Sequence, residues 1–218
     1  MPLRRNKLTA WAILVSFLAL VGYAGRLSGG KPPKDAAYLY STAASGLVQY
    51  AIILAVVLLI ARPDWSLLAL RRPGDWGRTV TSVLVVFVAV YAASAIVSAF
   101  SDPGREQGLT PHGWDSSRAV PFAVNFVVFV AVAPVVEELT FRGLGYSLLE
   151  PLGRLTAILW VGLTFGLAHG LLEGLPILIV FGCALAWLRD RSDSVYPGMA
   201  VHATFNAIAL IAAVTGVA

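Results

Sequence analysis

The sequence predicts an all-α fold, a polytopic transmembrane bundle of about seven to eight helices. Three observations predict it: 58% of the 218 residues are hydrophobic, only 13% are charged, and the mean hydropathy is +0.77. A soluble domain of this length carries nearly twice that charged fraction. One soluble core could not bury so much apolar surface, so most of it must face lipid.

Seven apolar stretches account for the predicted helices, since spanning a bilayer takes roughly 20 residues. They cover about 9–28, 41–61, 79–100, 119–148, 155–171, 174–188 and 195–216. The fourth is long enough to reach past the hydrocarbon, or to be two elements. The fifth and sixth are short, and Gly170–Gly174 separates them. We therefore expect these two to form a tight helical hairpin.

The first stretch begins with basic residues and resembles a signal peptide, but no clear small-x-small cleavage site follows it. We expect an uncleaved first helix. No internal repeat is visible, so we treat 1–218 as one integral membrane domain. Residues 1–118 supply its N-terminal helices, and 119–218 carry the motifs described below.

The distribution of basic residues favours a cytoplasmic N-terminus. Eleven Lys and Arg then lie inside and five outside. The inside group is Arg4, Arg5, Lys7, Arg62, Arg71, Arg72, Arg78, Arg142, Arg154, Arg189 and Arg191, and the outside group is Arg26, Lys31, Lys34, Arg105 and Arg118. An aromatic belt is expected near the inner boundary, at Trp11, Trp65, Trp76 and Trp187.

Several function classes are excluded or disfavoured. The net charge of +4 and pI near 9.5 do not indicate nucleic-acid binding, because the basic residues are scattered between apolar segments. Cys183 is the only cysteine, so no intramolecular disulfide can form. The loop Ser101–Arg118 reads as an external loop, and its His112 as incidental.

The fourth stretch contains the only acidic pair within a predicted span, Glu137 and Glu138. Charged groups at membrane depth are costly and usually face a protein interior or a wet cavity. Arg142 lies four residues after Glu138, on the same helical face, whereas Glu137 points about 100° away. One carboxylate can thus be held by the arginine while the other faces a cavity.

Two further spans carry polar groups. In the fifth, Phe165 and His169 are spaced i, i+4, and in the seventh His202 and Asn206 share that spacing and one face. At about 1.5 Å per residue, Glu137, His169 and His202 lie roughly 16, 21 and 10 Å from the inner ends of their helices. They can therefore meet inside the bundle.

Such a set supports hydrolysis. A carboxylate and a histidine around a water molecule form a general-base pair, and His–Asn donors on one face suit an oxyanion. Glu137, His169 and His202 could instead bind zinc, although no HExxH motif is present. Serine nucleophile chemistry is disfavoured, since no GxSxG surrounds a serine of the spans.

The three motifs together resemble the CAAX protease and bacteriocin-processing enzyme family. EELTFR resembles its EExxxR motif, FGLAH its FxxxH motif and HATFN its HxxxN motif, in the family's order. The resemblance implies an intramembrane endopeptidase with its active site inside the bundle. At the matching motif positions, the resemblance implies that Glu137 is the general base, assisted by His169. It also implies that His202 and Asn206 form the oxyanion hole. Arg142, Glu138 and Phe165 are expected to support the site, and no cofactor is expected unless zinc is used.

Eukaryotic members of this family have eight helices and cleave prenylated proteins. The short loops and the Ala, Val and Leu content here favour a bacterial cytoplasmic membrane instead, where a leader peptide or another membrane-associated peptide is the expected substrate. The alternative is a non-proteolytic membrane protein, either a scaffold or immunity-type protein or a transporter. Transport would favour repeated halves, and the polar residues occur in the C-terminal half alone.

Overall fold

The computed structural model describes residues 2–29, 35–100, 106 and 113–215, and within these ranges every regular element is a helix. Seven helical rods result, as predicted. Their bounds are α1 Pro2–Leu27, α2 Tyr40–Ala61, α3 Trp76–Ser98, the continuous run α5 to η6 (Ala119–Leu152), α8 Arg154–Ala168, α9 Leu175–Ser192 and α10 Tyr196–Thr215. His112 and most of the expected external loop lie outside the described residues.

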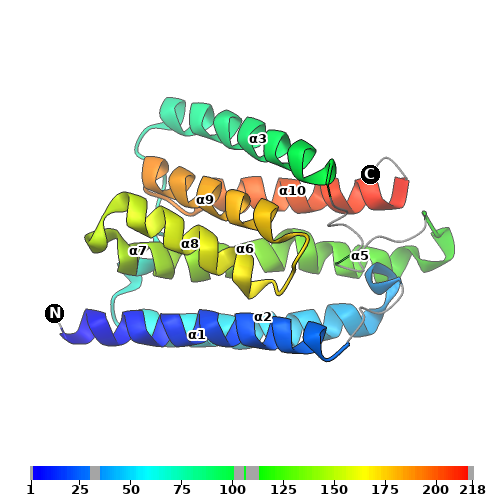
Figure 1. The fold of residues 1–218 in the computed structure, drawn as a ribbon, viewed down its shortest axis with the longest axis horizontal. Helices are drawn as coiled ribbons and strands as arrows, with labels where there is room; N and C mark the ends of the chain where they lie inside the picture. Colours follow the sequence, from blue (N-terminus) through cyan, green and yellow to red (C-terminus); the bar gives the residue numbers. More distant parts are fainter. Residues whose placement is uncertain (1, 30–34, 101–105, 107–112, 216–218) are drawn as a thin grey trace.

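The rods lie along one long axis in layers (Figure 1). α3 is on one side of the bundle, α1 and α2 are on the opposite side, and the motif-bearing helices run between them. α3 packs on α9, and α1 packs on α8. The middle of the bundle is therefore shielded from both sides, which suits costly polar side chains.

Five helices are long and apolar enough to cross a membrane: Arg4–Leu27, Tyr40–Ala61, Trp76–Ser98, Ser116–Leu152 and Tyr196–Thr215. Their outer faces remain uncovered, with Leu59 67% and Val88 71% exposed. Apolar surface of this extent requires lipid as its solvent. α8 is shorter, at 15 residues or about 22 Å.

The predicted hairpin of the two short stretches is confirmed by α8 and α9. Glycines bring the two helices together, because a Cβ on Gly182 would lie 2.7 Å from the Gly162 Cα atom. The turn after α8 needs Gly170, whose φ is +62°, and this residue touches α1. A Cβ on Gly22 of α1 would lie 3.0 Å from the Gly170 Cα atom.

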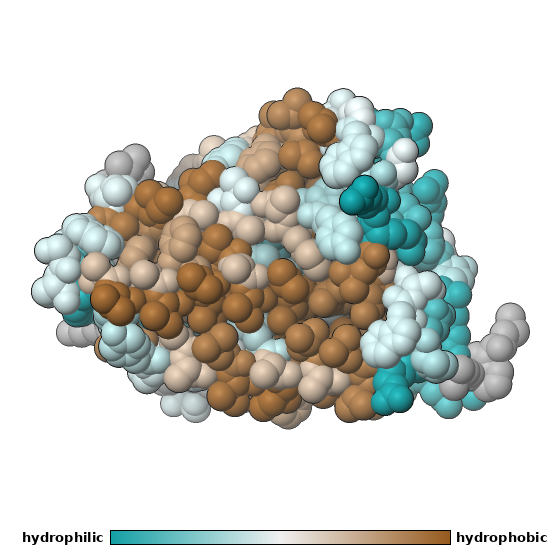
Figure 2. All heavy atoms as spheres, turned by 180° about the vertical axis from the view of Figure 1, so that it is seen from behind, coloured by the Kyte–Doolittle hydropathy of each residue, from teal (hydrophilic) through white to brown (hydrophobic). Residues whose placement is uncertain are grey.

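Polar residues gather at the end of the bundle that holds the N-terminus (Figures 1 and 2). We call it the basic end; its exposed arginines are Arg4, Arg5, Arg62, Arg71, Arg72, Arg78, Arg154 and Arg191. Figure 2 shows strongly hydrophilic side chains collected there and an apolar band over the middle of that face. The predicted clustering of these arginines is confirmed, whereas the side of the membrane they face stays a prediction.

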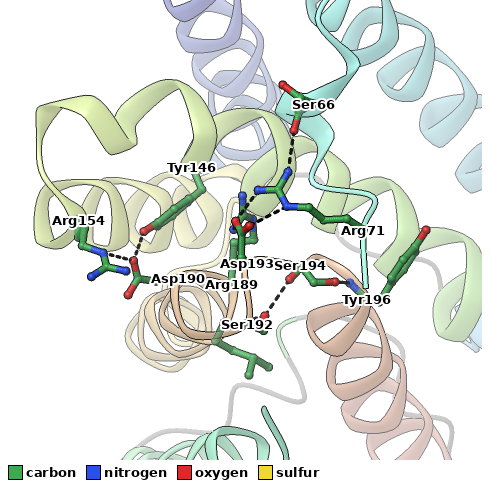
Figure 3. A network of polar contacts seen from close by, with 11 residues as sticks. Ser66, Arg71, Tyr146, Arg154, Arg189, Asp190, Ser192, Asp193, Ser194 and Tyr196 are labelled. Atoms are coloured by element: carbon green, nitrogen blue, oxygen red, sulfur yellow. Dashed lines mark hydrogen bonds and ion pairs between the residues drawn. The ribbon is translucent and has the colours of Figure 1, made fainter. Parts of the chain in front are cut away.

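An ion-pair network ties loops together at the basic end (Figure 3). Asp193, which ends α9 in a left-handed conformation, accepts hydrogen bonds from both Arg71 and Arg189, the Arg71 Nε bond being 2.8 Å. These bonds lower the pKa of Asp193. Nearby, Asp190 accepts from the Tyr146 hydroxyl at 2.5 Å and from Arg154 at 2.7 Å.

One sequence expectation about this end is wrong. Trp11 does not belong to an interfacial belt: it is 3% exposed and donates from Nε1 to the Thr140 carbonyl at 2.9 Å. The interior offers Trp11 a hydrogen-bond partner that the hydropathy pattern does not reveal. Arg142, counted among the inner basic residues, is fully buried beside Glu138, as its i, i+4 spacing predicts.

Candidate active site

The two glutamates lie in α6 (Ala133–Glu138), between two π-helical stretches, η4 (Val128–Val132) and η5 (Leu139–Gly145). The long stretch is thus one continuous helix, and the possibility of two elements is not realised. π turns leave carbonyls outside the usual ladder and often occur at functional sites. Here side chains of other helices reach two of them, Trp11 at Thr140 and Asn206 at Phe129.

Glu138 and Arg142 form the predicted i, i+4 pair. Arg142 Nη1 lies 2.9 Å from Glu138 Oε1, and their side chains are 0% and 1% exposed. Arg142 also donates to the Gly182 carbonyl at 3.1 Å and stacks over the Phe165 ring at 4.2 Å. Glu138 Oε2 is also buried without a hydrogen-bond partner among the described residues, but it packs against Gly198, where a Cβ would lie 2.5 Å away. The ion pair and this close packing hold Glu138 in one place.

Glu137 has a different environment. Its Oε1 accepts a hydrogen bond of 2.9 Å from the Tyr50 hydroxyl of α2. Its Oε2 faces two imidazoles, with His169 Nε2 at 3.8 Å and His202 Nε2 at 3.7 Å. That oxygen is buried and has no hydrogen-bond partner among the described residues. The predicted convergence of Glu137, His169 and His202 is confirmed.

The other ring nitrogens define how the imidazoles are oriented. His169 Nδ1 donates to the Phe165 carbonyl at 2.7 Å, and His202 Nδ1 donates to Glu138 Oε1 at 3.1 Å, since both partners are acceptors. Each ring therefore turns its Nε2 toward Glu137. Phe165 takes part twice, because its carbonyl orients one imidazole and its ring lies against Arg142.

Asn206 is the predicted site residue that lies apart from this group. Its Nδ2 donates to the Phe129 carbonyl at 2.8 Å, which ties α10 to the π stretch η4. No described hydrogen bond or ion pair joins it to the glutamates or to the histidines. Among the described residues it shares only a helix with His202, one turn away.

An apolar cavity of about 860 Å³ leads to this group. Glu137, His169 and Tyr50 line it together with residues of α1 and α2. Its outer lining includes Phe17 and Ile52, which are 59% and 61% exposed, so the cavity opens on the lipid-facing surface between these two helices. An extended apolar chain could thus reach Glu137 from the bilayer.

Metal binding was the alternative for Glu137, His169 and His202. Among the described residues, no three His, Cys, Asp or Glu side chains are placed to hold a metal ion. Zinc bonds of about 2.0–2.2 Å in a tetrahedron place the ligand atoms about 3.3–3.6 Å apart, slightly closer than the 3.7 and 3.8 Å found here. Zinc binding by these three residues stays an alternative.

Tyr50 was not predicted from the sequence. The only signal available was a polar pair, Gln49 and Tyr50, in the middle of an otherwise apolar span. A tyrosine is common at membrane boundaries and less so at mid-depth. This position therefore indicates a polar partner inside the bundle.

Comparison with known families gives one match. Residues 119–208 match the family described as type II CAAX prenyl endopeptidase Rce1-like, and all seven predicted site residues lie in this segment. The match confirms the resemblance seen in the three motifs and supports, at family level, a CAAX-type protease. No curated protein and no solved structure matches the chain. With its five apolar helices, the chain is an integral membrane protein.

Proposed function

We propose that the chain is an intramembrane endopeptidase that hydrolyses a peptide bond with a water molecule activated by Glu137 and His169. The observation that carries the proposal is the buried, unpartnered Oε2 of Glu137, which faces two imidazole nitrogens at 3.7 and 3.8 Å. These separations are too long for direct hydrogen bonds and suit a bridging water.

In this mechanism Glu137 Oε2 takes a proton from the water while the water oxygen bonds to the scissile carbonyl carbon. The carbonyl oxygen gains negative charge, and the tetrahedral intermediate then breaks its C–N bond. The proton held by Glu137 passes to the leaving amine, so atoms and charge balance. His169 Nε2 shares the water and holds its lone pair toward the substrate.

His202 is proposed to stabilise the oxyanion. Glu137, Glu138 and Arg142 carry a net charge of −1 when both carboxylates are ionised, which is costly inside an apolar bundle. As an imidazolium, His202 would donate from Nε2 as well as from Nδ1 and would offset that charge. Asn206 would assist with the amide N–H that does not bind Phe129. Glu138 and Arg142 hold His202 in place.

The substrate is proposed to be a membrane-associated or leader peptide, with the enzyme in a bacterial cytoplasmic membrane and its N-terminus inside. The apolar cavity between α1 and α2 supports an apolar chain as the occupant. No nucleic acid takes part.

Comparing the membrane and secreted peptidomes of cells that express wild-type protein or Glu137→Ala tests the proposal. Fragments that depend on Glu137 are expected, and their parent segments then serve as reporter peptides in proteoliposomes. Glu137→Ala and His169→Ala should each lose cleavage. Full cleavage by either variant overturns the assignment.

Two further arms separate the alternatives. A zinc-dependent protease would lose activity with a chelator and regain it with zinc, whereas the proposed mechanism predicts no response to either. A scaffold or immunity-type protein would keep its cellular effect in the nearly isosteric Glu137→Gln variant, in which the proposed enzyme is inactive.

A further inference from the structure

We infer that Tyr50 is a positioning residue of the active site: its hydroxyl binds Glu137 Oε1 and thereby presents Oε2 to the water. The inference deepens the proposed function and rests on it. It also makes α2 part of the catalytic apparatus, although α2 lies outside the matched segment 119–208. Nothing in the EExxxR, FxxxH and HxxxN motifs includes this residue.

The packing of α2 brings the hydroxyl to this point. Gly46, Tyr50, Ile53 and Val57 are spaced by three or four residues and share one face of the helix. Ile53 and Val57 are 7% and 0% exposed, so this face is the buried one. One turn before Tyr50, a Cβ on Gly46 would lie 3.2 Å from Val128, which shows how closely α2 approaches η4. The phenol must therefore point into the bundle.

The hydrogen bond from Tyr50 gives the two carboxylate oxygens of Glu137 different surroundings. Tyr50 occupies Oε1 at 2.9 Å, while Oε2 faces His169 and His202 without a partner. The terminal torsion of a glutamate is broad and roughly two-fold, so an untethered carboxylate would rotate. A neutral hydroxyl can hold the ionised group without offering a competing positive charge. An arginine would instead place a positive charge beside the carboxylate, as Arg142 does beside Glu138.

No other described residue supplies this tether. The hydroxyl of Thr140, which also lines the cavity, donates to the Val136 carbonyl at 2.7 Å within its own helix. Within the part of the chain that the structure describes, the polar groups facing Glu137 are thus Tyr50 from α2, His169 at the end of α8 and His202 from α10. Of these, the phenol alone is at hydrogen-bonding distance.

The test compares Tyr50→Phe with a matched control, Tyr40→Phe. Tyr40 begins the same helix, is 59% exposed and has no described hydrogen bond. With the reporter peptide in proteoliposomes, we expect Tyr50→Phe to lower kcat about 10- to 100-fold and to change KM less than about twofold, because alignment of the base is lost while binding is kept. Tyr40→Phe should match the wild type in both constants.

A spectroscopic arm needs no substrate. The infrared difference between wild type and Glu137→Gln isolates the carboxylate stretch of Glu137, and the same difference in a Tyr50→Phe background should place that band at another frequency. Tyr40→Phe should leave the band in place. The thermal unfolding temperature of Tyr50→Phe in detergent should stay near the wild-type value, which separates misalignment from misfolding.

The outcomes are distinguishable. An unchanged carboxylate band, or wild-type kcat in Tyr50→Phe while Glu137→Gln is inactive, overturns the role of Tyr50 and leaves the proposed function standing. Wild-type cleavage by Glu137→Gln overturns the proposed function itself, and the kinetic claim for Tyr50 with it. A lower kcat with equal unfolding temperature and a shifted band supports both.

Discussion

Two polar clusters in this bundle differ in how completely their charges are paired. At the basic end, Asp193 receives hydrogen bonds from Arg71 and Arg189, and Asp190 receives them from Tyr146 and Arg154. In the candidate active site, Glu137 Oε2 has no hydrogen-bond partner among the described residues and faces the two histidines at 3.7 and 3.8 Å. The paired carboxylates hold loops together, whereas the surroundings of Glu137 Oε2, beside a cavity and two imidazoles, suit its proposed role as a base.

The same contrast separates the adjacent glutamates. Glu138 contacts Arg142 at 2.9 Å and His202 at 3.1 Å, both buried. Within the part of the chain that the structure describes, Glu137 accepts a side-chain hydrogen bond from Tyr50 alone. The two neighbouring glutamates have different surroundings because they project about 100° apart, which supports the different roles proposed for them. Glu137→Gln and Arg142→Met test that difference directly.

The largest effect is expected from Glu137→Gln. Removing the general base should lower kcat at least about 10³-fold, while the thermal unfolding temperature stays within a few degrees of the wild type, because the lost carboxylate is weakly paired. Cleavage of the reporter peptide in proteoliposomes measures kcat, and thermal unfolding in detergent measures the unfolding temperature. A strongly destabilised variant would show that Glu137 is structural like its neighbour.

Arg142→Met should affect stability most. It leaves Glu138 buried without its cation, and breaking a buried ion pair costs about 3–5 kcal/mol. We expect a clearly lower unfolding temperature and loss of activity, because His202 also depends on Glu138. The control is Arg78→Met at the exposed start of α3, which should unfold like the wild type. Equal unfolding of the two variants would contradict the structural role of the pair.

Glu106 lies at the end of the bundle opposite the basic end, and its substitution is expected to have an intermediate effect on stability. Its carboxylate accepts the Leu172 and Gly174 amides at 2.6 and 3.0 Å and pairs with Arg26 at 2.8 Å. Burial would raise the pKa of Glu106, but these amides and Arg26 outweigh it and lower the pKa below its ordinary value of 4.5. The carboxylate thus stabilises the fold above that value, and the gain is lost as pH falls through the lowered pKa.

Glu106→Gln should cost about 1 kcal/mol at pH 7. Because the glutamine does not titrate, the difference in unfolding temperature between wild type and variant should shrink as pH is lowered from 7 to below 4.5. Thermal unfolding at several pH values measures it. A difference that is constant across this range would show that the charge of Glu106 contributes nothing.

The smallest effect is expected from Arg71→Gln, which leaves Asp193 paired with the buried Arg189. The pair of Asp193 with Arg71 is partly exposed, with side-chain exposures of 66% and 43%, so water and salt screen it. We expect a loss of about 0.5 kcal/mol, unchanged kcat, and a smaller loss at high salt. Unfolding with and without 1 M NaCl checks this. A variant with normal stability but impaired cleavage would connect the basic end to the chemistry.

Hydropathy and helical spacing predicted the helices and much of the site. Long apolar runs have few alternatives to helix in lipid, and i, i+4 spacing placed Arg142 beside Glu138 before any contact was known. Those signals are local. The contacts that were predicted correctly join residues that are close in sequence or that were expected at a similar depth in the bilayer.

Contacts between distant helices were not predictable in this way. Tyr50 reaches Glu137 across 87 positions, and Trp11 reaches Thr140 across 129. Such contacts depend on the rotation of each helix about its axis, which an almost uniformly apolar span does not specify. The binding of Asn206 to Phe129 has the same origin, since it requires a π stretch that no residue pattern indicated.

The shortness of α8 has a consequence for the surrounding bilayer. A rod of about 22 Å falls short of a hydrocarbon layer of about 30 Å, and Leu155 and Trp160 on its outer face are exposed to that layer. Hydrophobic mismatch of this kind thins the membrane locally at a modest energetic cost. His169 stands directly after α8, so we expect headgroups and bulk water to come close to the candidate site there. For the proposed hydrolysis, such thinning would shorten the path by which water reaches Glu137.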